Sequence, residues 1–241
     1  MSQPPLPVAI LAGGFAARLR PLTEDKPKAL IEVAGEPFIA HQLRLLRSEG
    51  IQDVVICAGH LGEMIEGFLG DGHASDVRVR YSYDGLEPLG TAGALKKALP
   101  LLGDAFFVLY GDSLLPCPYA PVQDAFLGSG CLGLMTVYRN EGHWDTSNIE
   151  FAEGRIVAYS KQHRTPAMQH IDYGLGVLRG SALEELDGPC DLAWLYQQLL
   201  ARDQLAAHEV HERFYEVGSF AGIDETAHYL KSQKDASPAV H

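Results

Sequence analysis

Residues 8–30 read VAILAGGFAARLRPLTEDKPKAL, and they carry more information about this chain than any other segment. Val8–Ala12 is a continuous apolar run, which predicts a buried strand, and Gly13 and Gly14 follow it directly. Two glycines after a strand allow backbone N–H groups to approach a polyphosphate closely. The segment therefore predicts a strand that ends in a positively charged, anion-binding loop. Its basic residues are Arg18, Arg20, Lys26 and Lys28.

The whole chain is acidic, which makes this local group of cations distinctive. Its 241 residues include 31 Asp and Glu against 19 Lys and Arg, a formal net charge of −12. Such a chain is not expected to bind nucleic acid, because that requires a broad basic face. A phosphorylated small molecule needs only a few local cations. A hydrophobic content of 46% and a charged content of 21% indicate an ordinary globular protein.

Neither a leader nor a membrane span is expected. The apolar run Leu6–Ala12 is short, contains Pro7 and lacks a basic flank. No other segment approaches the roughly 20 apolar residues of a membrane-spanning helix. The four cysteines show no zinc or redox spacing, so we expect reduced thiols, a cytoplasmic location and no membrane partner.

Short apolar runs alternate with helical patterns in the first half of the chain, which predicts a parallel βαβ sheet. The expected strands there are Val8–Ala12, Asp53–Ala58, Val77–Tyr83 and Phe106–Tyr110, and the expected helices are Phe38–Arg47, Leu61–Leu69 and Thr91–Leu99. Beyond about residue 130 strands dominate. They are expected at Leu132–Tyr138, Asn148–Phe151, Arg155–Tyr159 and Ile171–Leu178, with a helix at Leu192–Ala201. These elements indicate one α/β domain.

Two further segments place polar groups where predicted strands end. Asp112 follows Gly111 directly after the buried run Phe106–Tyr110. Ligands of open α/β sheets bind beyond the carboxyl ends of the strands, so this carboxylate is predicted to face a ligand and to suit Mg²⁺. Residues 87–94 read EPLGTAGA, in which Gly90 lets the backbone approach a flat ligand and Thr91 is expected to cap the next helix.

The glycine loop resembles the signature of the sugar-1-phosphate nucleotidyltransferases, Gly-Gly-x-Gly-x-Arg-Leu-x-Pro-x-Thr followed by Pro-Lys-x-Leu. Ala16 replaces the third glycine, and Ala17 replaces the usual Thr or Ser. The Glu-Pro-Leu-Gly-Thr form of residues 87–91 is most similar to the guanylyltransferases for mannose and heptose 1-phosphates. No Walker Gly-Lys-Ser/Thr is present, which disfavours a P-loop NTPase. The matching positions are Arg18, Leu19, Pro21, Thr23, Pro27, Lys28 and Leu30.

This resemblance implies a Rossmann-like three-layer αβα fold with a mixed, mostly parallel central sheet. It implies a single domain over 1–241, with a nucleotide-binding half at about 8–130, a sugar-phosphate-binding half at about 131–232 and a flexible tail at 233–241. Arg18 would grip the β- and γ-phosphates, and Lys28 would lie near the α-phosphate, which makes Arg18, Lys28 and Asp112 the expected catalytic residues. The expected nucleotide-binding residues are Leu11, Ala12, Gly13, Gly14, Arg18, Ala58, Gly59, Glu87, Gly90 and Thr91.

The metal and acceptor sites also follow from the resemblance. The segment Phe214–Ser219 resembles the family's hydrophobic-Asp-x-Gly-Thr element, so Glu216 would be the second Mg²⁺ ligand beside Asp112. Ser160-Lys161 resembles the family's Glu-Lys, and Asp172 takes the position of an Asn. The expected sugar-phosphate-binding residues are Asn148, Glu150, Lys161 and Asp172.

The implied reaction is transfer of a nucleotidyl group from an NTP to a sugar 1-phosphate, which yields an NDP-sugar and pyrophosphate. The motif form favours GTP with a mannose-type or heptose 1-phosphate. Two alternatives remain: cytidylyl or uridylyl transfer to another phosphorylated acceptor such as phosphocholine, and a catalytically inactive module that binds nucleotide sugars. Ala16 and Glu216 favour the inactive module, whereas Arg18, Lys28 and Asp112 argue against it. The sequence leaves the oligomeric state open.

Overall fold

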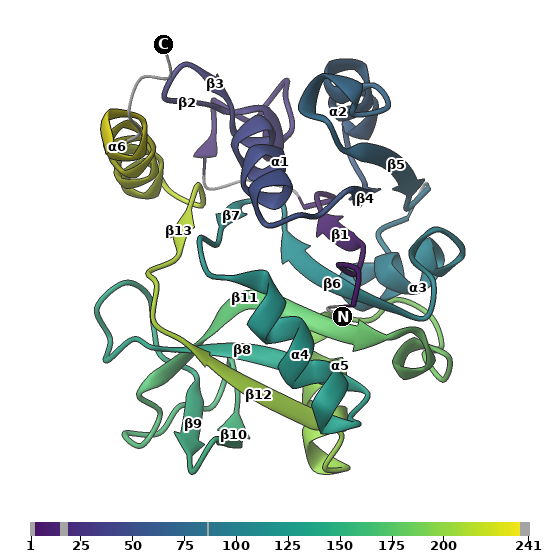
Figure 1. The fold of residues 1–241 in the computed structure, drawn as a ribbon, viewed down its shortest axis with the longest axis vertical. Helices are drawn as coiled ribbons and strands as arrows, with labels where there is room; N and C mark the ends of the chain where they lie inside the picture. Colours follow the sequence, from purple (N-terminus) through teal and green to yellow (C-terminus); the bar gives the residue numbers. More distant parts are fainter. Residues whose placement is uncertain (1–2, 15–18, 86, 237–241) are drawn as a thin grey trace.

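The computed structural model describes residues 3–14, 19–85 and 87–236, which fold around one nine-stranded sheet (Figure 1). The chain alternates between strands of this sheet and helices through its first half, as the βαβ pattern predicts. The strands of the sheet are β1 (Val8–Leu11), β4 (Asp53–Ala58), β5 (Arg78–Tyr83), β6 (Ala105–Tyr110), β8 (Gly133–Arg139), β9 (Ile149–Ala152), β10 (Arg155–Tyr159), β11 (His170–Arg179) and β12 (Leu205–Val210).

The sheet is mixed and mostly parallel. Strand β1 lies between β4 and β6 and is parallel to both, and β5 continues the sheet parallel to β4. Strand β11 is antiparallel to β6, β8 and β9, and β10 is antiparallel to β9. Since β12 is parallel to β8, only β10 and β11 oppose the common strand direction. The predicted α/β class and the predicted sheet are confirmed.

Helices cover both faces of the sheet, so the protein has three layers. Val8 and Ile10 of β1 pack on one face with side chains of α1, α2 and α4, whereas Ala9 packs on the other face with side chains of α3 and α5. This alternation is the period of two that a strand imposes on its side chains. The helices are α1 (Phe38–Ser48), α2 (Gly62–Leu69), α3 (Gly90–Leu102), α4 (Tyr119–Ser129), α5 (Leu192–Ala201) and α6 (Phe220–Ala236), with 3₁₀ turns η2 (Lys28–Leu30), η3 (His73–Ser75) and η4 (Gly180–Leu183).

Two short ladders and a third apolar cluster join the glycine loop to the end of the chain. The ladders are β2 (Glu32–Val33) with β3 (Glu36–Pro37), and β7 (Ser113–Leu114) with β13 (Tyr215–Glu216). Leu19, Leu114 and Val217 are buried in this cluster, and α6 packs against it. This packing brings η2, β7 and β13 together beside the sheet.

The structure also shows where the pattern-based expectations fall short. Helix α4 and strand β12 have no counterpart among the predicted elements, and Pro121 and Gly128 interrupt the helical pattern of α4. Helix α6 extends to Ala236, into the segment expected to be a flexible tail. The division at about residue 130 remains a prediction, since β6 pairs with β1 on one side and with β11 on the other.

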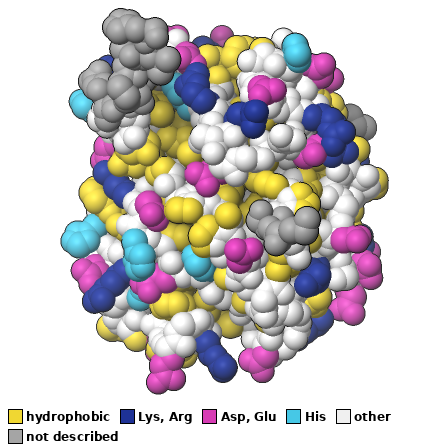
Figure 2. Space-filling model, in the orientation of Figure 1, with side chains coloured by type: hydrophobic (Ala, Val, Ile, Leu, Met, Phe, Trp, Pro, Cys, Tyr) yellow, Lys and Arg dark blue, Asp and Glu magenta, His cyan; other side chains and the backbone are white. Residues whose placement is uncertain are grey.

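Charged side chains of both signs are mixed on the face that Figure 2 presents. Lys and Arg side chains are scattered there among Asp and Glu side chains and do not form a continuous basic patch. No helix within the described residues is long and apolar enough to cross a membrane.

Candidate functional site

The carboxyl ends of β1, β4 and β6 meet at one edge of the sheet. The N–H of Ala12 donates to the Cys57 carbonyl (2.9 Å), and the N–H of Gly111 donates to the Leu11 carbonyl (2.9 Å). The glycines that follow β1 and β4 pack backbone against backbone, because a Cβ on Gly59 would lie 2.8 Å from the Gly13 oxygen and 2.9 Å from its Cα. Only glycine at position 59 allows this approach of the two loops.

The close contact between Gly59 and Gly13 predicts that an added methyl group at position 59 destabilises the protein, whereas the same change at Gly67 should stabilise it. We expect Gly59→Ala to lower the free energy of unfolding by about 1–3 kcal/mol, since the added methyl group must push the loops apart. Gly67 lies inside α2 with no atom within 4 Å of its Cβ position. Gly67→Ala is therefore expected to stabilise the protein, by up to about 1 kcal/mol. Urea denaturation of both variants measures the two effects, and equal effects would contradict the proposed contact.

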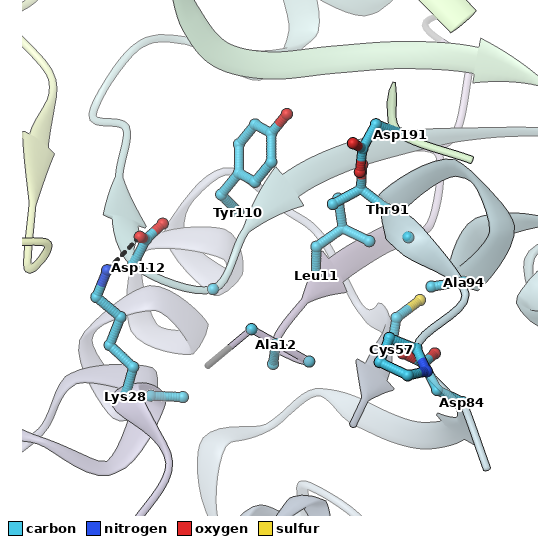
Figure 3. A pocket seen from close by; sticks show the side chains of 16 residues that line it. Leu11, Ala12, Lys28, Cys57, Asp84, Thr91, Ala94, Tyr110, Asp112 and Asp191 are labelled. Carbon is cyan, nitrogen blue, oxygen red and sulfur yellow. Dashed lines mark hydrogen bonds and ion pairs between the residues drawn. The ribbon is translucent and has the colours of Figure 1, made fainter. Parts of the chain in front are cut away.

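A cavity of about 370 Å³ opens at this edge of the sheet (Figure 3). Of the predicted nucleotide-binding residues, Leu11, Ala12, Gly13, Gly14, Gly90 and Thr91 line it, together with Lys28 and Asp112. Ala58, Gly59 and Glu87 do not line it. Ala58 is buried and faces α2, Gly59 is covered by Gly13, and Glu87 is exposed. Arg18, Ala16 and Ala17 lie outside the described residues.

One end of the cavity carries an ion pair. Lys28 Nζ lies 2.5 Å from Asp112 Oδ2, and the two side chains are 18% and 32% exposed (Figure 3). Lys28 reaches this position from η2, and Asp112 follows the buried strand β6. The hydroxyl of Ser113 donates to the other carboxylate oxygen of Asp112 (3.4 Å). The predicted catalytic lysine and aspartate are thus brought into direct contact.

Glu216 lies beside this pair because β13 pairs with β7. In that ladder Glu216 is opposite Ser113, and the N–H of Val217 donates to the Asp112 carbonyl (2.9 Å). Glu216 Oε1 and Lys28 Nζ lie 3.3 and 3.5 Å from the point that a Cβ on Gly218 would occupy. The two predicted metal ligands and Lys28 therefore form one cluster.

The donor set of this cluster fits Mg²⁺. Two carboxylates on adjacent backbone segments provide hard oxygen ligands, and Mg²⁺ usually takes one or two carboxylates and completes its shell with phosphate oxygens and water. Within the described ranges, no group of three or more His, Cys, Asp and Glu side chains is arranged for a metal. A pair of carboxylates suits a metal whose remaining ligands come from a phosphorylated ligand and water.

The opposite end of the cavity carries two carboxylates that the motifs did not indicate, Asp84 and Asp191 (Figure 3). Asp84 follows β5, and burial raises the pKa of its carboxyl group, although Lys97 and the N–H of Leu89 oppose this rise. The strand-end argument that identified Asp112 applies equally to Asp84. Asp191 comes from the second half of the chain, and no local sequence signal places it here.

Asp191 reaches the cavity because its segment is bonded to the start of α3. The N–H of Cys190 donates to the Leu89 carbonyl (2.9 Å), and the N–H of Ala92 donates to the Cys190 carbonyl (2.8 Å). The prediction that Thr91 caps its own helix is wrong. Helix α3 already begins at Gly90, and the Thr91 hydroxyl accepts the N–H of Leu192 (2.7 Å) at the start of α5. Thr91 therefore accepts a hydrogen bond from the first residue of α5 and does not cap α3.

A second cavity of about 280 Å³ meets the first at Tyr110 and Asp112. Of the predicted sugar-phosphate-binding residues, Asn148, Lys161 and Asp172 line it. Glu150, two residues beyond Asn148 and inside β9, does not line it. Glu216 also lines this cavity. Additional polar side chains that the motifs did not indicate are Ser113, Asp145, Thr146 and Arg164.

Asp172 owes its position to an irregularity in β11. The pairing of β11 with β8 shifts register between Asp172 and Gly176, and such bulges turn side chains out of the regular pleat. The carboxylate accepts the N–H of Gly174 (3.0 Å), and the Asp172 N–H donates to Asn148 Oδ1 (3.0 Å). Burial raises the pKa of Asp172, and the Lys161 ammonium opposes that rise.

Comparisons with known proteins agree with this geometry. The profile of the nucleotidyl transferase family matches residues 8–139. The chain is 46% identical over 106 residues to the N-acetylmuramate alpha-1-phosphate uridylyltransferase of Neisseria meningitidis serogroup B, covering 44% of this chain and 46% of that protein. It is 30% identical over 185 residues to mannose-1-phosphate guanylyltransferase 1 of Arabidopsis thaliana, covering 74% and 51%. The chain thus spans about half the length of these two relatives.

Solved structures share the fold over nearly the whole chain. HddC from Yersinia pseudotuberculosis complexed with GMP-PN has a TM-score of 0.78 at 18% identity, covering 93% of this chain and 99% of that one. UDP-glucose pyrophosphorylase from Acinetobacter baumanii has a TM-score of 0.79 at 16% identity, covering 96% and 95%. At these identities the likeness establishes the fold and not the substrates.

Proposed function

The chain belongs to the nucleotidyl transferase family, and from this premise we infer that it transfers a nucleotidyl group from an NTP to a sugar 1-phosphate and releases pyrophosphate. The observation that supports this most strongly is the meeting of two cavities at Asp112, beside Lys28. A transferase needs a donor and an acceptor whose reacting atoms meet at one point of concentrated charge. The glycine-lined cavity suits the NTP, and we call it the donor cavity. The cavity with Lys161 suits the sugar phosphate, and we call it the acceptor cavity.

The proposed reaction is a direct in-line displacement. A phosphate oxygen of the sugar 1-phosphate attacks the α-phosphorus of the NTP, the new P–O bond forms, and the bond to the β-phosphate breaks to release pyrophosphate. The attacking oxygen is already anionic at neutral pH, so no base has to remove a proton. Lys28 would neutralise charge that develops on the α-phosphate, and the Gly13–Gly14 backbone would hold the phosphates.

A covalent intermediate on the protein is not part of this proposal. Cys57 is the thiol in the wall of the donor cavity. Burial raises its pKa to about 12, and the nearby Asp84 carboxylate adds to the rise. The thiol therefore stays protonated at neutral pH, and a protonated thiol is a poor nucleophile. Positioning and charge neutralisation are sufficient for phosphoryl-type transfer.

Asp112 and Glu216 would hold Mg²⁺ at the junction of the two cavities. When bound there, the ion would supply a positive charge that orients the α-phosphate and stabilises the transition state. Asp112 now pairs with Lys28, so the carboxylate must be shared between the ammonium and the metal.

The donor base is proposed to be guanine. The phosphates belong at the Lys28–Asp112 end of the donor cavity, so the base belongs at the end that carries Asp84 (Figure 3). An ionised carboxylate only accepts hydrogen bonds. Guanine presents adjacent N–H donors to such a group, whereas uracil presents one N–H between two carbonyl oxygens. A mannose 1-phosphate or a related sugar phosphate is the proposed acceptor.

A screen of donors and acceptors tests the proposed function. The protein is incubated with each NTP, Mg²⁺ and a panel that includes mannose 1-phosphate, heptose 1-phosphate, N-acetylmuramate 1-phosphate and phosphocholine, and pyrophosphate release is measured. We expect the highest kcat/KM with GTP and a mannose-type acceptor. Nucleotide binding without pyrophosphate from any pair would instead support the inactive module, and turnover of phosphocholine alone would support the second alternative.

The role of Asp84 makes a separate specificity prediction. We expect Asp84→Asn to raise the KM for GTP by roughly 10- to 100-fold, the effect of losing hydrogen bonds to a charged group, with little change in the KM for UTP. Steady-state kinetics with both nucleotides measures the ratio. Glu63→Gln, which removes an exposed carboxylate at the start of α2, is the matched control. An unchanged GTP preference in Asp84→Asn would contradict the placement of the base.

A further inference from the structure

Four side chains stack at the side of the acceptor cavity. The guanidinium carbon of Arg213 lies 3.3 Å from the centroid of the Trp144 ring and 4.8 Å from that of Tyr215. The Tyr215 ring in turn stacks on Tyr229 of α6, with centroids 4.1 Å apart and an interplanar angle of 19°. We call these residues the Arg213 stack. It joins the loop between β8 and β9 to a much later part of the chain, which contains Arg213, strand β13 and helix α6.

Arg213 is held firmly from the side of α6. It lies between β12 and β13, where the chain climbs from the lower part of the sheet toward α6 (Figure 1). Its guanidinium pairs with Glu225, and its side chain is only 25% exposed. Its buried Nε forms no hydrogen bond among the described residues. Of the two rings in contact with the guanidinium, that of Trp144 is the nearer, and Trp is the strongest partner for a cation of this kind.

The loop that carries Trp144 is organised around Asn140, which is fully buried. Asn140 Nδ2 donates to the Asp145 carbonyl (2.5 Å) and to Ser147 Oγ (3.2 Å), and its Oδ1 accepts the N–H of Trp144 (3.2 Å). These bonds make residues 140–147 a single unit. Through Asn140, the backbone of Trp144 is linked to Asp145 and Ser147.

Residues adjacent in sequence to Trp144 and to Tyr215 line the acceptor cavity. Asp145 and Thr146, next to Trp144, form one part of its wall, and Phe214 and Glu216, on either side of Tyr215, form another part. No member of the stack lines the donor cavity. The stack is thus connected to the acceptor side and to Glu216, and it is separate from the surface that would hold the nucleotide base.

We propose that Arg213 is a positioning residue that holds the 140–147 loop against the acceptor cavity through Trp144, and so sets the affinity for the sugar phosphate. This inference rests on the proposed function of the two cavities. Loss of the stack releases Asp145 and Thr146 from the acceptor wall and leaves the glycine loop in place. Acceptor affinity is therefore expected to fall while donor affinity is retained.

The first arm of the test needs no turnover. Trp144 and Trp194 are the two tryptophans of the chain, so Trp194→Phe leaves Trp144 as the sole source of tryptophan fluorescence. In that background we compare acrylamide quenching of Trp144 with Arg213 intact and with Arg213→Lys. Lysine keeps the charge beside Glu225 and lacks the planar group that covers the ring. We expect quenching to rise by at least about twofold, and unchanged quenching would overturn the stack as the support of the loop.

The second arm measures affinity. We expect Arg213→Lys to raise the KM for the sugar phosphate by about tenfold, the size of effect of a partly buried cation–π contact, with the KM for GTP changed less than about twofold. Trp144→Ala should match it, the double variant should be no worse than either single variant, and Trp144→Phe should restore most of the affinity. Arg202→Lys, an exposed arginine paired with Glu185, is the matched control.

The outcomes separate this inference from the proposed function. An equal rise of both KM values, or a fall in melting temperature with neither KM changed, indicates a merely structural role and overturns the proposal. If no acceptor yields pyrophosphate, the proposed function fails, and the same comparison is made by calorimetric binding of mannose 1-phosphate and GTP. A tenfold weaker Kd for mannose 1-phosphate alone supports the positioning role, and unchanged or equally weakened binding of both ligands overturns it.

Discussion

Asp112→Asn is expected to lower kcat by roughly a thousandfold, because it removes the carboxylate charge at the junction of the two cavities. Loss of one preorganised electrostatic contact to a transition state typically costs a factor of 10² to 10³, and a metal ligand adds to that effect. Asn has the shape of Asp, so the fold and the contact with Ser113 are retained. We also expect a higher Mg²⁺ concentration for half-maximal activity.

The measurement is kcat as a function of Mg²⁺ concentration, together with the thermal midpoint. Asp76→Asn is the control, since it removes a carboxylate that pairs with Arg47 and is 80% exposed. Exposed pairs of this kind contribute little to stability. Full activity of Asp112→Asn would show that the reaction does not require the charge of this carboxylate.

Lys28→Met is expected to lower kcat by about 10²- to 10³-fold and to strengthen Mg²⁺ binding. The ammonium lies 2.5 Å from the Asp112 carboxylate, so it competes with a metal for the same oxygens. Methionine keeps the length of the side chain without the charge. The carboxylates would then bind Mg²⁺ more tightly, while the α-phosphate would lose its protein cation during transfer.

The two variants thus have effects of the same sign on turnover and of opposite sign on metal affinity. Calorimetric titration of Mg²⁺ in the presence of GTP measures the second effect, and Lys231→Met on the exposed side of α6 is the control. A Lys28→Met protein that binds Mg²⁺ more weakly than the unmodified chain would contradict a shared position of the ammonium and the metal at Asp112.

Much of the donor site could be read from local sequence, because strand ends are a local property. The apolar runs that end in Gly13 and Asp112 form β1 and β6, and these strands are adjacent and parallel. Residues that follow such strands lie at the same edge of the sheet, so Asp84, which follows β5, could have been found by the same argument. The bounds of β4 and β10 are those that the pattern predicted.

The motifs were less reliable for individual contacts. Thr91 matched the pattern of a helix cap, but its hydroxyl bonds to α5, because a cap depends on which N–H group lies within reach. Ala58 and Glu87 belong to the right segments and still do not line the cavity, since the pleat and the local exposure decide where each side chain points. A motif therefore locates a segment at the site more reliably than it assigns each residue a contact.

The sequence by itself determined the α/β class and the family. It also placed Lys28 in a charged loop and Asp112 at the end of a strand. Tertiary structure alone decided that β13 pairs with β7 and sets Glu216 beside Asp112, that Asp191 reaches the donor cavity, and that Arg213 meets Trp144. The physical reason is the range of the interactions. Strand and turn signals arise from neighbouring residues, whereas these contacts depend on ladders and ring stacking between segments that only the folded core brings together.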